Sequence, residues 1–178
     1  MSDNALYCLT IDNENGIWIG SYFGGINYYP KQHALFNKFF PKPGENSISG
    51  NAVREIQKDQ YGNLWIGTED AGLNKLNTKT GIITNYRPSK SDGTLSHYNI
   101  HALLPRGNDL WVGTFEHGLD IMDITTGEVI KHYSQGDGHG LASNFVYALY
   151  EDDSKNIFAV TASGIQSYNL ENDTFTTL

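Results

Sequence analysis

Leu64-Trp65-Ile66-Gly67-Thr68 decides the fold, because the chain contains this stretch once and three further variants of it. An earlier copy reads Ile17-Trp18-Ile19-Gly20-Ser21, a later one reads Leu110-Trp111-Val112-Gly113-Thr114, and the last is degraded to Ile157-Phe158-Ala159-Val160-Thr161. The aromatic residues, at positions 18, 65, 111 and 158, are separated by 47, 46 and 47 positions. A fixed period of this length is typical of a repeat protein, in which each repeat forms one supersecondary unit.

The residues around this stretch predict four short strands in each repeat. A strand over 51–58 leads into the tight turn Asp59-Gln60-Tyr61-Gly62-Asn63, where Gly62 can adopt a positive φ. Further strands are expected over 64–68, 73–76 and 82–86. Four antiparallel strands repeated at this period form a β-propeller blade. A β-helix has shorter coils, and a leucine-rich repeat needs a Leu/Asn spacing that is absent here.

The sequence therefore predicts an all-β chain of four four-stranded antiparallel blades, a partial or small propeller formed by residues 1–178. Their approximate bounds are residues 4–40, 51–86, 99–133 and 144–178. One blade cannot bury both of its faces, and stacking the blades does so. Trp18, Trp65 and Trp111 are then expected between neighbouring blades, with stacking on sugars as the alternative. The fourth strands are marked by an apolar residue three positions before an aromatic one: Ile83/Tyr86, Ile130/Tyr133 and Phe36/Phe39.

Composition excludes several classes of function. The net charge is −8 and no Lys/Arg cluster occurs, which argues against nucleic acid or an anionic membrane surface as the partner. Cys8 is the only cysteine, so an intramolecular disulfide and a thiolate metal cluster are excluded, and we expect a buried side chain. No apolar run has the length of a membrane span, and residues 1–4 lack the features of a secretory signal.

The repeats resemble the two-component regulator propeller repeat. Repeat two carries that pattern at Asn51, Asp59, Gly62 to Thr68, Gly72-Leu73 and Thr80-Gly81. Repeat four departs from it, with Phe158 in place of Trp and Val160 in place of Gly. The resemblance implies the periplasmic sensor region of a hybrid histidine kinase of the Bacteroidetes type, which detects glycan breakdown products. Such regions form two rings of blades, followed by a further β domain, a membrane helix and the kinase.

With four repeats, the chain is expected to be a segment of such a sensor. A closed four-bladed ring, and two chains that assemble into an eight-bladed ring, are the alternatives. An open arc exposes apolar faces on its end blades, and this predicts self-association. The expected partners are an oligosaccharide or other small glycan, the rest of the parent sensor chain and a second copy. No cofactor and no metal is expected, and the inferred location is periplasmic.

Loops that differ between repeats point to one face as the binding face, since function usually lies on variable loops held by a rigid scaffold. These loops join the second to the third strand, or one blade to the next. Aromatic candidates for stacking on sugar rings are Tyr22, Phe23 and Phe115. Polar candidates for hydroxyl or charged groups are Arg54, Glu69, Asp70, Glu116 and Asp137, with the histidines His97, His101, His117 and His139.

Two further positions recur at the start of each blade. Asn4, Asn51, Asn99 and Asn144 are expected to satisfy backbone groups there. Tyr7, Arg54, Ala102 and Tyr147 share a place on the innermost strand, where they point into a central channel or, for the tyrosines, plug it. His101 does not fit this alignment. It is either a histidine of the rim or the sign of a register change around residues 100–102.

The sequence contains no nucleophile motif, metal pair or phosphate loop, so we expect a sensor and not an enzyme. Gly24-Gly25 is followed by no predicted helix and does not form a dinucleotide fingerprint. Glu69 and Asp70 are adjacent on one loop, where two carboxyl groups rarely face one another as a glycosidase requires. The alternatives are a non-catalytic interaction scaffold and, less favoured, a propeller lyase or glycosidase.

Overall fold

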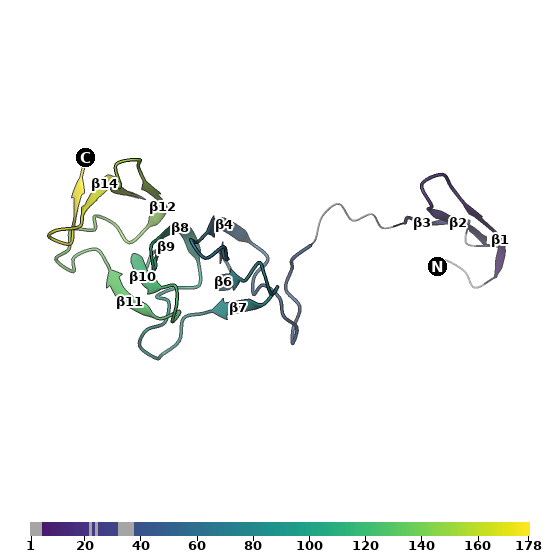
Figure 1. Ribbon diagram of the computed structural model, residues 1–178, viewed down its shortest axis with the longest axis horizontal. Coiled ribbons are helices and arrows are strands. Elements are labelled where there is room, and N and C mark those ends of the chain that lie inside the picture. Colours follow the sequence, from purple (N-terminus) through teal and green to yellow (C-terminus); the bar gives the residue numbers. More distant parts are fainter. Residues whose placement is uncertain (1–4, 22, 24, 32–37) are drawn as a thin grey trace. The chain divides into compact units, whose positions relative to one another are not determined.

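The computed structural model describes residues 5–21, 23, 25–31 and 38–178, and within these residues it contains strands and no helix. The chain divides into two compact units, Met1–Lys38 and Phe39–Leu178. The first unit holds a three-stranded antiparallel sheet of β1 (Leu6–Ile11), β2 (Ile17–Ser21) and β3 (Ile26–Tyr29) (Figure 1). No helix capable of crossing a bilayer occurs in the described part of the chain.

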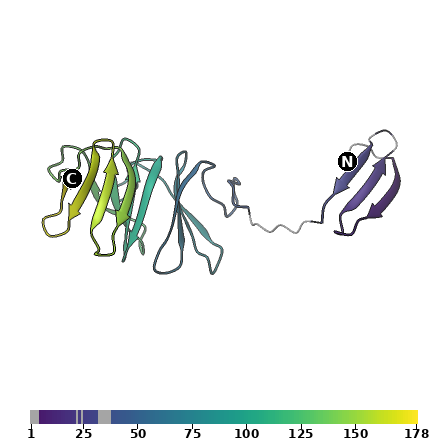
Figure 2. The ribbon, with the colours of Figure 1, turned by 90° about the horizontal axis from the view of Figure 1, so that it is seen from above.

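The second unit contains three four-stranded antiparallel sheets, and each has its strands in sequence order. The innermost strands β4, β8 and β12 gather on one side, with β8 in contact with both of the others, and each sheet extends outward from them (Figures 1 and 2). The first sheet is β4 (Val53–Lys58), β5 (Leu64–Thr68), β6 (Gly72–Leu76) and β7 (Ile83–Tyr86). The second is β8 (Ile100–Arg106), β9 (Asp109–Thr114), β10 (Leu119–Asp123) and β11 (Val129–Tyr133). The third is β12 (Val146–Glu151), β13 (Ile157–Thr161), β14 (Gly164–Asn169) and β15 (Thr174–Thr177).

This arrangement confirms the predicted β-propeller blades. Each predicted tryptophan strand is the second strand of its sheet, and Gly62 has the expected positive φ of 87°. The strand expected over 51–58 begins two residues later, at Val53. In the first unit, Phe36 of the predicted fourth strand lies outside the described residues, and Phe39 belongs to no strand.

Two apolar layers lie between the three sheets of the second unit. Trp65 and Leu73 pack against Ile100 and Leu103 of the next sheet, and Trp65 is fully buried. Leu119 and its neighbours pack in the same way against the third sheet, in a layer that includes Trp111, Val146, Ile157 and Phe175. The prediction that Trp65 and Trp111 lie between blades is therefore confirmed. The sheets hold together because large aromatic and aliphatic side chains leave water at these two layers.

Two side chains of the first unit, Trp18 and Cys8, were expected to be buried. Within this unit Trp18 packs on Tyr28, with ring centroids 4.3 Å apart, and 40% of its surface is exposed, while its place between blades stays a prediction. Cys8 is exposed, so the expected burial of this residue was wrong. It faces Gly20 across the sheet, where a Cβ would lie 2.6 Å from Cys8 Sγ. The thiol therefore covers a glycine on the surface of a small sheet and does not enter a core.

The first turn of repeats one, two and four is organised by an aspartate, which is Asp12, Asp59 or Asp152. Asp59 accepts hydrogen bonds from the backbone N–H groups of Tyr61 and Asn63, from Asn63 Nδ2, and from Trp65 Nε1 at 3.0 Å. Burial raises the pKa of Asp59, but these hydrogen bonds outweigh it and the net pKa is lowered. The turn thereby fixes the tryptophan that fills the layer to the next sheet.

The connection into each blade is held by a buried polar side chain of its third strand. In the first of the three sheets, Asn74 Oδ1 accepts from Ser49 N and from Asn85 Nδ2. In the third, Gln166 Oε1 accepts from Ala142 N. The middle sheet uses ionisable groups, which are described next.

Asp120 in the middle sheet is 1% exposed, and it accepts from Ser96 N at 2.8 Å and pairs with His132 Nδ1 at 2.7 Å. The hydrogen bond to Asp120 is the main reason why the pKa of His132 is raised. Burial opposes the shift, and the charges of Asp120 and Asp137 add to it. The pair takes the place that the neutral pair Asn74 and Asn85 fills in the preceding sheet.

We expect the His132 pair to give the chain a pH-dependent stability. A raised folded-state pKa contributes stability that is present below the unfolded value, about 6.5, and is lost as pH rises through the folded value. The matched control is the Asp120→Asn/His132→Asn double variant, which copies the pair Asn74 and Asn85. The unfolding temperature of the wild type, relative to that of the control, should therefore fall as pH rises through this range. A difference that stays constant with pH would contradict the assignment.

Candidate functional site

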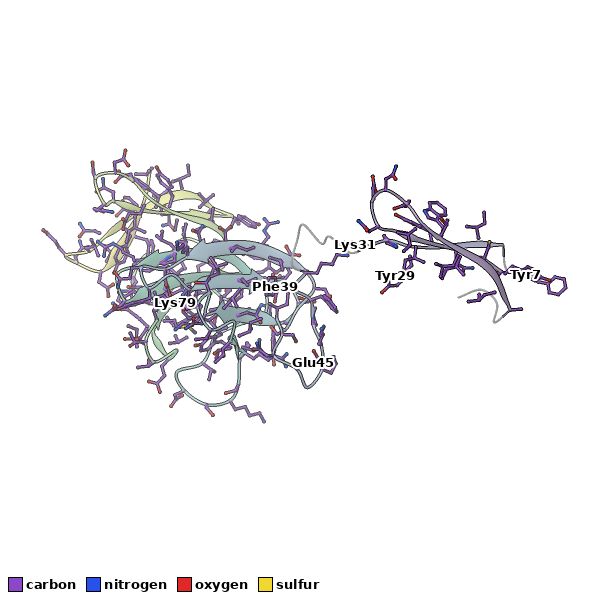
Figure 3. The ribbon with its side chains drawn as sticks, turned by 45° about the vertical axis from the view of Figure 1, so that its right-hand side comes forward. Tyr7, Tyr29, Lys31, Phe39, Glu45 and Lys79 are labelled. Carbon is purple, nitrogen blue, oxygen red and sulfur yellow. The ribbon has the colours of Figure 1, made fainter. Side chains whose placement is uncertain are left out.

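Each innermost strand contains a β-bulge at one position. The pairing register shifts between Leu6 and Cys8, between Val53 and Glu55, between Ile100 and Ala102, and between Val146 and Ala148. Each shift marks one extra residue in the innermost strand, and bulges re-aim such side chains and are frequent beside functional sites. The bulged residues are Tyr7, Arg54, His101 and Tyr147. Tyr7 extends outward from its sheet in the first unit (Figure 3).

This register corrects two of the sequence alignments. His101, and not Ala102, is the equivalent of Arg54 and Tyr147, so the register change expected around residues 100–102 is present. The N–H after each second strand donates to Ala52, Asn99 and Phe145, which makes Asn99 the equivalent of Ala52 and not of Asn51. The physical cause is that repeat three is one residue shorter, since its first turn is the short Gly107-Asn108 connection.

A charged group connects the first two sheets of the second unit. Glu69 Oε1 lies 3.7 Å from Arg54 Nη1 and 3.8 Å from His101 Nε2. Arg54 and Glu69 are about half exposed, whereas the His101 side chain is 11% exposed. Burial lowers the pKa of His101, the positive charge of Arg54 lowers it further, and Glu69 opposes both. These effects favour a neutral imidazole between the carboxylate and the aromatic side chains beside it.

Aromatic side chains continue the site toward the third sheet. The His101 ring is 5.2 Å from Phe115 and 6.1 Å from Tyr147. Phe115 meets Phe145 edge to face at 4.9 Å, and Phe145 lies 6.5 Å from Tyr147. We call Arg54, Glu69, His101, Phe115, Phe145 and Tyr147 the rim cluster. Its residues come from the bulges and the adjoining loops of three successive blades.

Two buried polar atoms of this region have no partner within the described residues, His101 Nδ1 and Asn99 Oδ1. Unpaired buried polar atoms are rare in proteins and require an explanation, such as an ordered water or a change of the site on binding. Both lie on strand β8 or directly before it, next to the charged part of the rim cluster. The cluster is therefore a place where hydrogen-bonding capacity remains unused.

Other predicted site residues serve the loops themselves. Asp70 accepts from Asn51 N at 3.0 Å and from Ala52 N at 3.4 Å, and the first of these bonds is the main cause of its lowered pKa. Asp137 accepts from the backbone of Ser134 and His139, and so closes its own loop. These two carboxylates hold the chain as it enters a blade or turns between blades.

His97 and His117 form a separate pair beside the rim cluster. Their rings stack at 4.2 Å with an interplanar angle of 3°. Burial lowers the pKa of His97, and so does His117, while the exposed Glu116 raises it. In the described part of the chain, no group of three His, Cys, Asp or Glu side chains is placed to hold a metal ion. Phe23 is 86% exposed in the first unit, and Tyr22 lies outside the described residues.

Sequence reasoning missed Phe145 and placed Tyr147 only in a channel. Both would have been found from the repeat itself, because Phe145 takes the place of Ala52 and Asn99, directly before the bulge of its blade. The signal was hidden by the one-residue deletion in repeat three, which offsets the alignment around His101.

Residues 47–70 match a family model whose description is "Two component regulator propeller". This segment of the chain is similar to that family. It holds β4 and β5, and with them Arg54 and Glu69 of the rim cluster. The other two blades of the second unit repeat the same strands and the same bulge.

The chain is similar to several solved structures. The extracellular domain of the putative hybrid two component system BT4673 from B. thetaiotaomicron superposes with a TM-score of 0.69 and 20% identity, over 98% of this chain and 25% of that one. The corresponding domain of BT3049 from the same organism gives 0.57 and 21%, over 99% and 30%. PorZ, a surface component of the type-IX secretion system of Porphyromonas gingivalis, gives 0.60 and 16%, over 92% and 25%.

These likenesses show the fold. The chain spans a quarter to three tenths of the length of the solved chains that it matches. No curated protein matches the sequence.

Proposed function

We propose that the chain is part of the extracytoplasmic ligand-sensing region of a hybrid two-component sensor, and that its rim cluster binds an oligosaccharide. The repeat match and the likeness to extracellular domains of such systems support the first part. The observation that carries the second part is the set of three consecutive bulges, which bring Arg54, His101 and Tyr147 into one group. Relay of binding to a kinase belongs to the same proposal.

The chemistry of the rim cluster fits a sugar. A sugar ring has an apolar face that packs on aromatic side chains and hydroxyl groups that need donors and acceptors. Phe115, Phe145 and Tyr147 supply the aromatic surface, and Tyr147 is 40% exposed. Arg54 supplies several N–H donors, and Glu69 supplies acceptors. Because Glu69 neutralises Arg54, the cluster favours a neutral oligosaccharide over a strongly charged ligand.

Glu69 and Asp70 do not form the carboxylate pair of a glycosidase. Glu69 faces Arg54 and His101, whereas Asp70 is bound to the backbone at residues 51 and 52. The rim cluster thus has the groups of a binding site, and we propose that it acts without catalysis.

Thermal unfolding against a panel of plant and host oligosaccharides tests this proposal. A ligand at a hundredfold excess over its Kd should add about 2.7 kcal/mol to the free energy of unfolding. We expect Arg54→Ala and Tyr147→Ala each to weaken the binding of that ligand, with a Kd about tenfold higher or more. The control is Lys79→Ala, in the turn between β6 and β7 (Figure 3), which should leave affinity unchanged. Stabilisation by no sugar, or stabilisation that survives both rim variants, would contradict the proposal.

A further inference from the structure

The contact between successive blades is repeated in its details. We call the face of a sheet that packs on the next sheet its forward face. It carries the tryptophan of the second strand and, on the third strand, Leu73 or Leu119. The next sheet brings the residue before its bulge, Ile100 or Val146, and both of these are fully buried.

A glycine on the forward face makes room for that residue. A Cβ at Gly67 would lie 2.7 Å from Ile100 Cγ2, and a Cβ at Gly113 would lie 2.8 Å from Val146 Cγ1. Cβ contacts this short essentially do not occur, so a side chain at either position would push the next sheet away. The forward face thus requires a glycine at this position wherever the innermost strand of the next sheet, which we call the arriving strand, carries a β-branched residue before its bulge.

The forward face of the third sheet has the same pattern with one change. Phe158 takes the place of the tryptophan, and Ile165, which is 50% exposed, takes the place of Leu73 and Leu119. Tyr150 stacks beside Phe158 and is 60% exposed. Val160 stands where Gly67 and Gly113 stand. The face is apolar like the two covered ones, and it bears a side chain at the position where they have none.

We propose that Val160 selects what can cover this face: a further four-stranded blade whose innermost strand carries glycine before its bulge. The continuity with the two existing blade contacts argues for a blade, because Phe158 and Ile165 keep the apolar surface on which a blade packs. The bulk of Val160 argues for the glycine. In the other two contacts the forward face carries a glycine and the next sheet carries Ile100 or Val146, whereas here the forward face carries the large side chain.

The same relation excludes a second copy of the chain. In a second copy of the chain, the sheets that could cover this face carry Leu6 (first unit) or Val53 (second unit) before their bulges, and these residues are 47% and 44% exposed. Either side chain would clash with Val160, because even a Cβ at the matching positions Gly67 and Gly113 would lie too close to the residue before the bulge. End-to-end self-association, which an open arc otherwise predicts, is therefore blocked at this face. This inference rests on the blade contacts and is independent of the proposed ligand.

Sedimentation velocity over a wide concentration range, on the full 178-residue chain, tests the proposal. Val160→Gly removes the obstruction and should strengthen self-association by about tenfold or more. Val160→Thr keeps the size of the side chain and is the matched control, which should behave like wild type. Leu6→Gly/Val53→Gly trims the arriving strands and leaves Val160 in place, and it should gain self-association as well.

Adding Ile165→Glu to Val160→Gly should abolish the gained association, because it places a charge on the same face. Far-UV circular dichroism and a melting curve establish that each variant is folded. A folded Val160→Gly that associates no better than Val160→Thr would overturn the proposal. Wild-type self-association that Ile165→Glu disrupts would also overturn it, since a second copy would then be the occupant.

Discussion

Replacing Trp65 by alanine is expected to lower the free energy of unfolding of the second unit by about 3–5 kcal/mol, the usual effect of truncating a buried tryptophan. The side chain is fully buried between two sheets, and the Lys75 ammonium lies over its ring, 5.1 Å from the centroid. The loss combines the transfer of the indole to water with the cavity left behind. Chemical denaturation, followed by circular dichroism, measures it.

A comparison of two phenylalanine variants separates packing from hydrogen bonding. Trp65 Nε1 donates to Asp59, whereas Trp111 Nε1 is buried with no partner among the described residues. Trp65→Phe removes a hydrogen bond to a carboxylate, a loss of about 1.5–3 kcal/mol. Trp111→Phe loses the same part of the indole ring, but the N–H that it removes is unpaired, so it should be clearly less destabilising. Equal effects of the two variants would contradict the role given to Asp59.

Asp173→Ala is expected to destabilise the second unit by about 2–4 kcal/mol, since several hydrogen bonds to one charged group are lost together. Asp173 Oδ1 accepts from the hydroxyl groups of Tyr133 and Tyr168, both at 2.5 Å, and Oδ2 pairs with Lys131. His139 Nδ1 contacts the Asp173 carbonyl oxygen at 2.8 Å. This clasp joins two blades and the connection between them, and Asp173→Asn should retain part of its hydrogen bonding.

The same carboxylate predicts a dependence on pH. Burial raises the pKa of Asp173, but Lys131 and the two tyrosine hydroxyls outweigh it and hold the pKa far below its usual range. The stability gained from a lowered pKa is present above the unfolded value, about 3.9, and is lost as pH falls below it. The difference in stability between wild type and Asp173→Asn should therefore be largest near neutral pH and shrink below about pH 4. A difference that grows in acid would contradict the assignment.

The blades could be predicted from the sequence because each repeat contains the residues that determine its own strands and turns. Trp65 and Trp111 are large apolar side chains that favour burial, Gly62 permits the first turn, and the spacing sets one supersecondary unit. The rim cluster could be predicted only in part. The sequence indicates Arg54, Glu69, His101 and Phe115 as candidates, but their grouping depends on bulges, which shift the register by one residue and leave little trace in composition.

Residues with the same chemistry also had roles that the sequence alone does not separate. Asp70 and Glu69 are neighbours, yet one binds backbone N–H groups and the other faces Arg54 and His101. Exposure of a carboxylate is decided by which backbone donors the loop brings to it, and this follows from tertiary structure. Val160 was visible as a departure from the repeat, but its meaning required the distances at Gly67 and Gly113.

The most direct test of the central proposal, that the rim cluster binds an oligosaccharide, is an NMR titration. The sugar that most raises the unfolding temperature is added to the wild-type chain while the ring signals of His101 and Tyr147 are followed. His139, which belongs to the Asp173 clasp, serves as the internal reference. We predict saturable shifts of the His101 and Tyr147 signals and none for His139. Shifts confined to His139, or no shift with any sugar of the panel, would contradict the proposal.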